Sequence, residues 1–319
     1  MSENSKVIDF GAHLYPDQVI PTGLQDRFRS TDVEPRLSCP DTLLSFYDDA
    51  GIDAAVLSQP PYMSSTDAAA TAEANDRLLE IVDNNDRFYG LAAIPTRAGG
   101  EIAAAEFERC LENGYHGGAI ETMAGEKGYV YEDVRPVFDV AEAWNAPILV
   151  HPKLHESLHP KVLDERFYLN RTFGREVALL ADLFAVIHGG VLDQHPELAL
   201  VYHHLGGNVG SMMGRIRLQL DPERWPDESD AKSFDEFRTQ LRERVYVDTS
   251  GFFGDETATQ AAVDELGADN VVFGSDYPFE PRTPTELKTL VESAATAAGD
   301  RSREVCFENA ESLLVNTSR

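Results

Sequence analysis

The sequence predicts an α/β protein, a single (β/α)₈ TIM barrel that spans residues 1–319. The first observation is a set of eight short apolar runs, at residues 7–10, 54–58, 88–94, 117–121, 147–151, 198–204, 245–250 and 270–276. Most are continuously apolar, as expected of parallel strands that are buried on both faces. The second is that helical periodicity separates these runs, most clearly at residues 67–85, 101–113, 133–145 and 171–187.

Glycines mark where several of these helices would end. Gly51, Gly114 and Gly267 each follow a helical run, at the position of a C-terminal cap. Eight strands that alternate with helices fit either a closed barrel or an open, doubly wound sheet. The open sheet that binds a dinucleotide lacks support, because no Gly-x-Gly-x-x-Gly follows the first strand. We therefore favour the barrel.

Two long connections interrupt the alternation. Residues 152–169 follow the fifth predicted strand, and in a barrel the loops after the strands line the active face. We expect this segment, which contains His155 and His159, to act as a lid or a substrate loop. Residues 221–233 follow a helix instead, so we expect a solvated acidic insertion there.

The charge balance limits the partners of this protein. The chain has 27 Lys and Arg against 55 Asp and Glu, a formal net charge of −28. Nucleic acid and anionic membrane surfaces need a basic footprint, and this surface repels both. Of the basic residues, 21 are Arg and only 6 are Lys. We interpret this as a halophilic adaptation, since concentrated salt screens self-repulsion; an acidic mesophilic protein with few lysines is the alternative.

The cysteines indicate the compartment. Cys39, Cys110 and Cys306 are far apart and odd in number, and no Cys-x-x-Cys occurs, so no disulfide framework or thiolate zinc site is expected. Free thiols fit a reducing cytoplasm. Residues 1–6 are polar, unlike the apolar core of a signal peptide. The sequence also contains no apolar run of about 18 residues, so no transmembrane helix is expected. We expect a cytoplasmic protein.

Polar residues of metal-binding types stand where the predicted strands end. His13 follows the first strand, His151 closes the fifth, His204 closes the sixth and Asp276 closes the eighth. In a barrel these ends meet at one mouth, where catalysis in this fold takes place. Imidazoles and a carboxylate are the usual ligands of zinc, iron and manganese. We therefore predict a metal site at the mouth.

Short motifs occur in order along nearly the whole chain. They are IDFGAH at residues 8–13, ILVHP at 148–152, GVLD at 190–193, HPEL at 195–198, HLGG at 204–207, GRI at 214–216, VDTS at 247–250 and FGSDYP at 273–278. In this order they resemble the amidohydrolase-related (amidohydrolase 2) family, which includes aminocarboxymuconate-semialdehyde decarboxylase and the orcinol- and resorcylate-type decarboxylases. The resemblance implies a TIM barrel of the metal-dependent hydrolase type. It also implies a carboxy-lyase or hydrolase that acts on a small carboxylated or carbonyl substrate, a divalent metal (zinc first, with manganese or iron as alternatives) and a homodimer.

The family pattern assigns roles to the residues at the strand ends. His13, His151 and Asp276 match metal ligands, and His204 matches a histidine that transfers a proton near the substrate. Asp276 would also be catalytic, delivering a proton in a decarboxylase or accepting one from water in a hydrolase. This chain departs from the pattern at Gly11, which stands where the family has its first metal ligand.

Gly11 leaves several alternatives open. A metal could bind through His13, His151 and Asp276 alone. Glu121, at the end of the fourth predicted strand, could supply a further ligand. The site could also work without a metal, or the barrel could have lost its chemistry and bind a small ligand only. We expect room for one imidazole beside Gly11, on the face that it shares with His13.

An anionic substrate needs a local cation in spite of the negative net charge. Lys153 stands two residues after His151, and Arg36 is a second candidate for binding the substrate. Glu121 would face the same mouth, either against the substrate or paired with a basic residue. Further candidates are Arg171 and Arg215.

Overall fold

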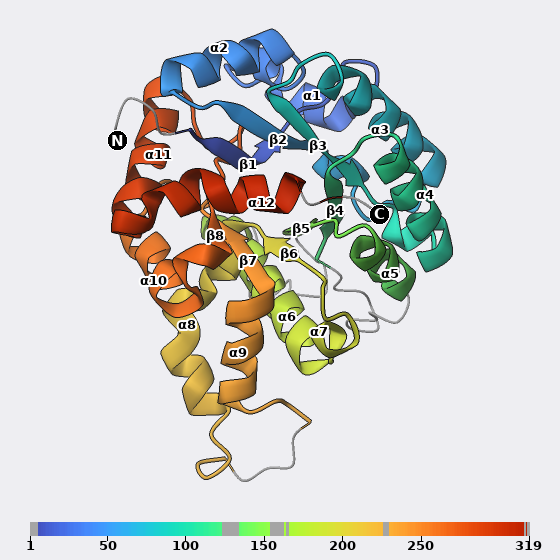
Figure 1. Cartoon of the computed structure of the whole chain (residues 1–319). Coiled ribbons are helices and arrows are strands. Elements are labelled where there is room, and N and C mark those ends of the chain that lie inside the picture. The colour runs from blue at the N-terminus through green and yellow to red at the C-terminus, as the bar shows by residue number, and fades with distance from the viewer. Residues whose placement is uncertain are drawn as a thin grey trace.

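The computed structural model describes residues 6–122, 134–153, 163, 166–225, 230–315 and 317. These residues form a sheet of eight strands, hydrogen-bonded in the order β1 to β8 (Figure 1). The strands are β1 (Ile8–His13), β2 (Ala54–Ser58), β3 (Phe88–Ala93), β4 (Gly117–Glu121), β5 (Ile148–His151), β6 (Leu200–Tyr202), β7 (Val245–Asp248) and β8 (Val271–Val272). Each pairing between neighbours is parallel. The predicted strands are therefore confirmed, within a few residues at their ends.

The two edges of the sheet come together next to β8. The N–H of Phe10 in β1 donates a hydrogen bond to the carbonyl of Phe273, which directly follows β8. The sheet thus curves into the predicted barrel. The eighth strand is shorter than the predicted 270–276, because the N–H of Phe273 donates to the carbonyl of Val305 instead of to β7.

Helices surround the barrel, as Figure 1 shows. They are α1 (Thr22–Phe28), α2 (Pro40–Ala50), α3 (Ala68–Val82), α4 (Gly100–Glu112), α5 (Arg135–Ala143), α6 (Arg175–His188), α7 (Val191–Gln194), α8 (His204–Gln219), α9 (Phe234–Arg244), α10 (Glu256–Leu266), α11 (Pro284–Ala298) and α12 (Asn309–Val315). Side-chain caps fix several starts: Asp67 accepts from the N–H of Ala70 at α3, and Ser233 forms a capping box with Glu236 at α9.

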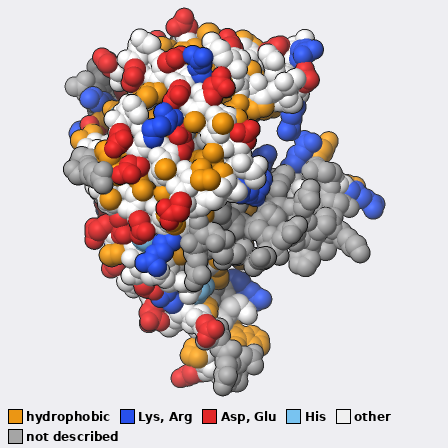
Figure 2. Space-filling view, turned by 90° about the vertical axis from the view of Figure 1, so that its right-hand side faces the viewer, with side chains coloured by type: hydrophobic (Ala, Val, Ile, Leu, Met, Phe, Trp, Pro, Cys, Tyr) orange, Lys and Arg blue, Asp and Glu red, His pale blue; other side chains and the backbone are white. Residues whose placement is uncertain are grey.

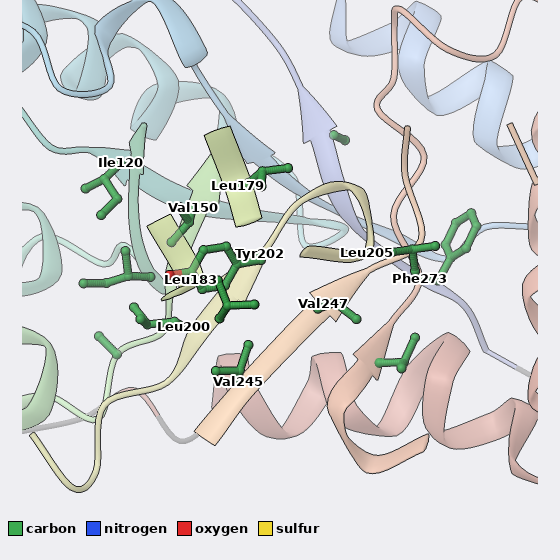
Figure 3. Close-up of a cluster of buried hydrophobic side chains, with 14 of the residues drawn as sticks. Ile120, Val150, Leu179, Leu183, Leu200, Tyr202, Leu205, Val245, Val247 and Phe273 are labelled. Atoms are coloured by element: carbon green, nitrogen blue, oxygen red, sulfur yellow. The ribbon is translucent and has the colours of Figure 1, made fainter. Parts of the chain in front are cut away.

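The hydrophobic core has two layers, which the barrel wall separates. Strand residues of one alternation, such as Phe10, Leu149 and Val201, pack inside the barrel together with residues of α12. Residues of the other alternation, such as Val150 and Tyr202, pack outward among the helices (Figure 3). Each strand therefore has a period of two, and its inner face continues towards the mouth.

The two predicted connections and the surface can be placed in part. Residues 154–162, 164 and 165 of the first connection, with His155 and His159, lie outside the described residues. Trp225, in the described part of the second, is 49% exposed, as expected of a solvated insertion. Acidic side chains are scattered over the face in Figure 2. No helix of the described ranges is long and apolar enough to cross a membrane.

Candidate active site

Three histidines meet at the mouth of the barrel. His13 is the last residue of β1, His151 is the last of β5, and His203 directly follows β6. The ring centroids lie 5.2 Å apart for His13 and His151, 5.5 Å for His13 and His203, and 5.0 Å for His151 and His203. One nitrogen of each ring lies within 4.8 Å of the others, close enough for the three rings to share one ion.

The alternation of inward and outward side chains on β5 and β6 explains why His151 and His203 point to the mouth. Leu149 on β5 and Val201 on β6 pack inside the barrel. The residues two positions further on, His151 and His203, therefore face the same interior at its open end.

A register shift in β1 explains why His13 also points to the mouth. On β1 Phe10 packs inside the barrel, so a regular strand would place Ala12 inside as well. The pairing of β1 with β2 shifts between Asp9 and Ala12, and Ala12 packs outward. His13 therefore turns to the mouth, because this irregularity exchanges the two faces of the strand.

His13 is held by bonds on both sides of its ring. Its Nδ1 lies 2.9 Å from Oγ of Ser58, in a hydrogen bond. Its Nε2 lies 3.2 Å from Oδ1 of Asp276, which comes from the loop after β8. Burial lowers the pKa of His13. Burial alone would raise the pKa of Asp276, but the hydrogen bond and charge of His13 outweigh it and hold that pKa below its ordinary value.

His203 is fixed by a fully buried carboxylate. Nδ1 of His203 donates to Oδ2 of Asp248 on β7, and neither side chain has any exposed surface. Asp248 also accepts from the N–H of His204 and of Ser250, each at 3.1 Å. Burial opposes the charge of Asp248, yet His203 and Ser250 keep its pKa below the ordinary value. Asp248 is thus an ionised support behind the ring.

The nitrogens that remain fit a metal. Nδ1 of His151 and Nε2 of His203 are buried and have no hydrogen-bond partner among the residues described, whereas Nε2 of His13 has the carboxylate of Asp276 beside it. Buried polar atoms in native proteins nearly always have partners. Burial and the neighbouring histidines lower the pKa of His151 well below its ordinary value, so its ring is neutral and has a free lone pair. Neutral imidazoles next to the carboxylate of Asp276 are a donor set that zinc, iron and manganese accept.

His204 lies beside this cluster but is bonded differently. Its Nδ1 is 3.1 Å from Oε1 of Glu176 on α6, and the side chain is almost fully buried. Burial opposes its protonation, but the bond and charge of Glu176 outweigh burial and raise the pKa of His204. The residue can hold a proton next to the cluster.

A cavity of about 370 Å³ opens above these residues. Its floor includes the side chains of His151, His204 and Asp276, and its described lining is otherwise mainly apolar with two cations. The remaining lining residues are Tyr15, Leu24, Arg27, Phe28, Pro60, Pro61, Pro152, Arg175 and Phe279. Arg27 is exposed, whereas Arg175 is half-buried. Arg175 lines the cavity and forms no ion pair with any residue in the described ranges.

The predicted substrate residues Lys153, Glu121 and Arg36 are not among the described residues that line the cavity, although Glu121 pairs in register with His151. Nζ of Lys153 pairs with the carboxylate of Glu121 across β4 and β5. Each thus neutralises the other's charge, and the role of Glu121 as a metal ligand or substrate residue stays a prediction. Arg36 is buried outside the described lining, where its guanidinium donates to the carbonyls of Asp32 and Pro281.

Sequence reasoning missed two residues of the site. His203 stands next to His204, and the motif HLGG drew attention to the second histidine. The alternation on β6 could have indicated His203: Val201 faces the barrel interior, and the residue two positions further on points to the same side. Arg175 carried no signal of its own, since the packing of α6 against the barrel sets its position.

Comparison with known proteins identifies the family. The profile of the amidohydrolase family matches residues 8–314. The chain belongs to the amidohydrolase family. Among curated members, gamma-resorcylate decarboxylase of Rhizobium sp. (strain MTP-10005) is 29% identical over 76% of this chain and 78% of its own length. The 2-amino-3-carboxymuconate-6-semialdehyde decarboxylase of Dictyostelium discoideum is 27% identical over 75% of this chain and 67% of its own length.

Solved structures of two decarboxylases share the fold. A 2,6-dihydroxybenzoate decarboxylase in complex with 2,6-dihydroxybenzoate superposes with a TM-score of 0.82 at 23% identity, over 98% of this chain and 99% of that one. A dihydroxybenzoic acid decarboxylase from Polaromonas sp. JS666, with bound manganese and the inhibitor 2-nitroresorcinol, has a TM-score of 0.82 at 21% identity, over 98% and 97%. The predicted TIM barrel and the predicted family are thus both confirmed.

Proposed function

We propose that this amidohydrolase is a metal-dependent carboxy-lyase that removes the carboxyl group from a small hydroxylated aromatic acid. The observation that carries the proposal is the cluster of His13, His151 and His203, whose member His151 has an unpartnered buried nitrogen and lines, together with Asp276, a cavity with aromatic walls. The relatives named above are decarboxylases, and one of them is solved with 2,6-dihydroxybenzoate. A flat ring with a carboxylate matches the shape and charge of this cavity.

The metal is a divalent ion held by His13, His151 and Asp276, and by a further donor considered below. When bound, such an ion supplies a positive centre that orients the substrate's carboxylate and neighbouring hydroxyl oxygen. The Polaromonas dihydroxybenzoic acid decarboxylase named above is solved with manganese, as are two further solved structures that share the fold. We propose zinc for this chain, because the donors are mostly imidazoles, which suit zinc and iron better than manganese.

The side chains around the metal bind the substrate and move one proton. Arg175 anchors an anionic oxygen of the substrate, and Tyr15, Phe28 and Phe279 hold the ring. His204, with Glu176 behind it, delivers a proton to the ring carbon that carries the carboxylate. The bond between that carbon and the carboxylate then breaks, its electron pair restores the aromatic ring, and carbon dioxide leaves.

The products of one reaction test this proposal. Purified protein supplied with zinc or manganese should convert 2,6-dihydroxybenzoate to 1,3-dihydroxybenzene and carbon dioxide in equal amounts, measured by chromatography and gas release. Benzoate is the matched control, because it lacks the hydroxyl groups and should not react. Protein that holds metal but releases no carbon dioxide from any hydroxylated benzoate would contradict the proposal.

Location and assembly belong to the same proposal. We propose a cytoplasmic protein, supported by the free thiols of Cys39, Cys110 and Cys306. A homodimer is supported by the exposed side chains of Phe167, Tyr168 and Phe173, which precede α6. Light scattering during gel filtration measures the mass, and about 70 kDa, twice the chain's 35.2 kDa, is expected.

A further inference from the structure

We propose that His203 is a ligand of the metal and takes the place that a side chain at position 11 would occupy. The donor then comes from β6 instead of β1. The inference rests on the proposed function, because it concerns the metal that the decarboxylation uses. Its evidence is the packing around Gly11 and the free nitrogen of His203.

Gly11 is required by space and not by its backbone conformation. Its φ lies outside the positive range that favours glycine. A Cβ at this position would lie 3.0 Å from Cε1 of His203, 3.1 Å from Oδ2 of Asp248 and 3.2 Å from Cα of Gly274. Such contacts are tighter than ordinary van der Waals distances. The room for one imidazole beside Gly11 is therefore filled by the ring of His203.

The ring of His203 presents a metal-binding nitrogen to the cluster. Because Nδ1 donates to Asp248, Nε2 is the ring nitrogen that remains to bind a metal. This Nε2 is buried and has no hydrogen-bond partner among the described residues. A carboxylate behind an imidazole, which fixes its tautomer and raises its basicity, is the usual arrangement around metal-bound histidines.

A metal-free ion pair explains the geometry less well. If His203 were a protonated structural partner of Asp248, its Nε2–H would be a buried donor without an acceptor in the described part of the chain. The free Nδ1 of His151 would also lack a partner, in a ring whose centroid lies 5.0 Å from that of His203. One cation among the three rings satisfies all of these atoms together.

Zinc binding by four proteins tests the exchange of donors. They are the wild type, His203→Ala, the double variant Gly11→His with His203→Gly, and His188→Ala. His188→Ala is the control, because it removes an imidazole that binds the N–H of Lys232 away from the mouth. Each protein is titrated with zinc against a chelator of known affinity, and X-ray absorption of the loaded protein counts the imidazole ligands.

The expected result follows from the loss of one donor. His203→Ala should bind zinc at least about 100-fold more weakly and with one imidazole fewer. The double variant should recover affinity and the third imidazole, and His188→Ala should match the wild type. Asp248→Asn keeps the ring and should weaken binding by about 10- to 100-fold, which covers the case in which His203→Ala does not fold.

Two results would overturn the inference. Wild-type affinity and imidazole count in His203→Ala would show that His203 is not a ligand. A double variant that binds zinc no better than His203→Ala would show that positions 11 and 203 do not exchange a donor. If the wild type itself bound no divalent metal, the proposed function would fail instead.

Discussion

The inside of the barrel and its mouth are built from the same strands but bury opposite kinds of side chain. On β5 the interior residue is Leu149 and the next on that face is His151; on β6 Val201 is followed in the same way by His203. Burial of each apolar side chain contributes about 1.5–3 kcal/mol to folding. A buried polar group costs free energy unless it has a partner. A step of two residues along one face of a strand thus separates apolar side chains that stabilise the fold from histidines whose free ring nitrogens need a ligand.

Removal of the proton donor should give the largest effect at the mouth. His204→Gln should lower kcat by about 10²- to 10⁴-fold, because the substituted side chain cannot deliver a proton. Steady-state kinetics measure the loss. Metal content, measured by elemental analysis, should stay at the wild-type value. A loss of metal would show that His204 is a metal ligand and would contradict its role as the proton donor.

A truncation inside the barrel should show the reverse behaviour. Leu91 on β3 is fully buried in the interior layer, and β3 carries none of the proposed ligands. Leu91→Ala should lower the free energy of unfolding by about 2–5 kcal/mol through the cavity that it leaves. Urea unfolding measures the change. Activity per folded molecule should be retained. A loss of kcat without a loss of stability would contradict the view that the interior stabilises the fold while the mouth carries the catalysis.

The cation of the cavity should affect binding more than turnover. Arg175→Gln should raise KM by about 10- to 100-fold, since a charge-assisted bond of about 1.5–3 kcal/mol to the substrate is lost. The matched control is Arg171→Gln, four residues earlier, where the guanidinium lies over the ring of Tyr168. Equal KM values for both variants would exclude Arg175 as the anchor.

The outer surface is a third region, and its effect should be the smallest. If the acidic, lysine-poor composition is a salt adaptation, Tm should rise by several degrees as KCl increases from about 0.1 M to above 1 M, where the Debye length shortens from about 10 Å to about 3 Å. Thermal unfolding at constant pH measures this shift. A Tm that does not change with KCl would favour the mesophilic alternative.

Most of the fold could be predicted from the sequence, because parallel strands buried on both faces leave continuous apolar runs. The predicted strand at 270–276 was too long, since apolar character does not distinguish a strand from a buried segment such as Phe273 that bonds elsewhere. The single-domain span of residues 1–319 stays a prediction.

The candidate site could be predicted in part. The sequence places three of its residues, His13, His151 and Asp276, at the ends of predicted strands. In a barrel of parallel strands these ends meet at one mouth, so the topology alone brings the three residues together. The face on which His13 lies depends on the register shift in β1, which leaves no mark in the sequence. His203 depends on the space beside Gly11, and such a contact between distant strands appears only in three dimensions.

One measurement tests most directly whether the mouth is a metal centre for decarboxylation. Protein stripped of metal by a chelator is titrated with zinc or manganese, while carbon dioxide release from 2,6-dihydroxybenzoate is followed. No release is expected before metal is added, and the rate should then rise until one ion is bound per chain. Stripped protein that releases carbon dioxide at the full rate would show that the mouth is not a metal centre for decarboxylation.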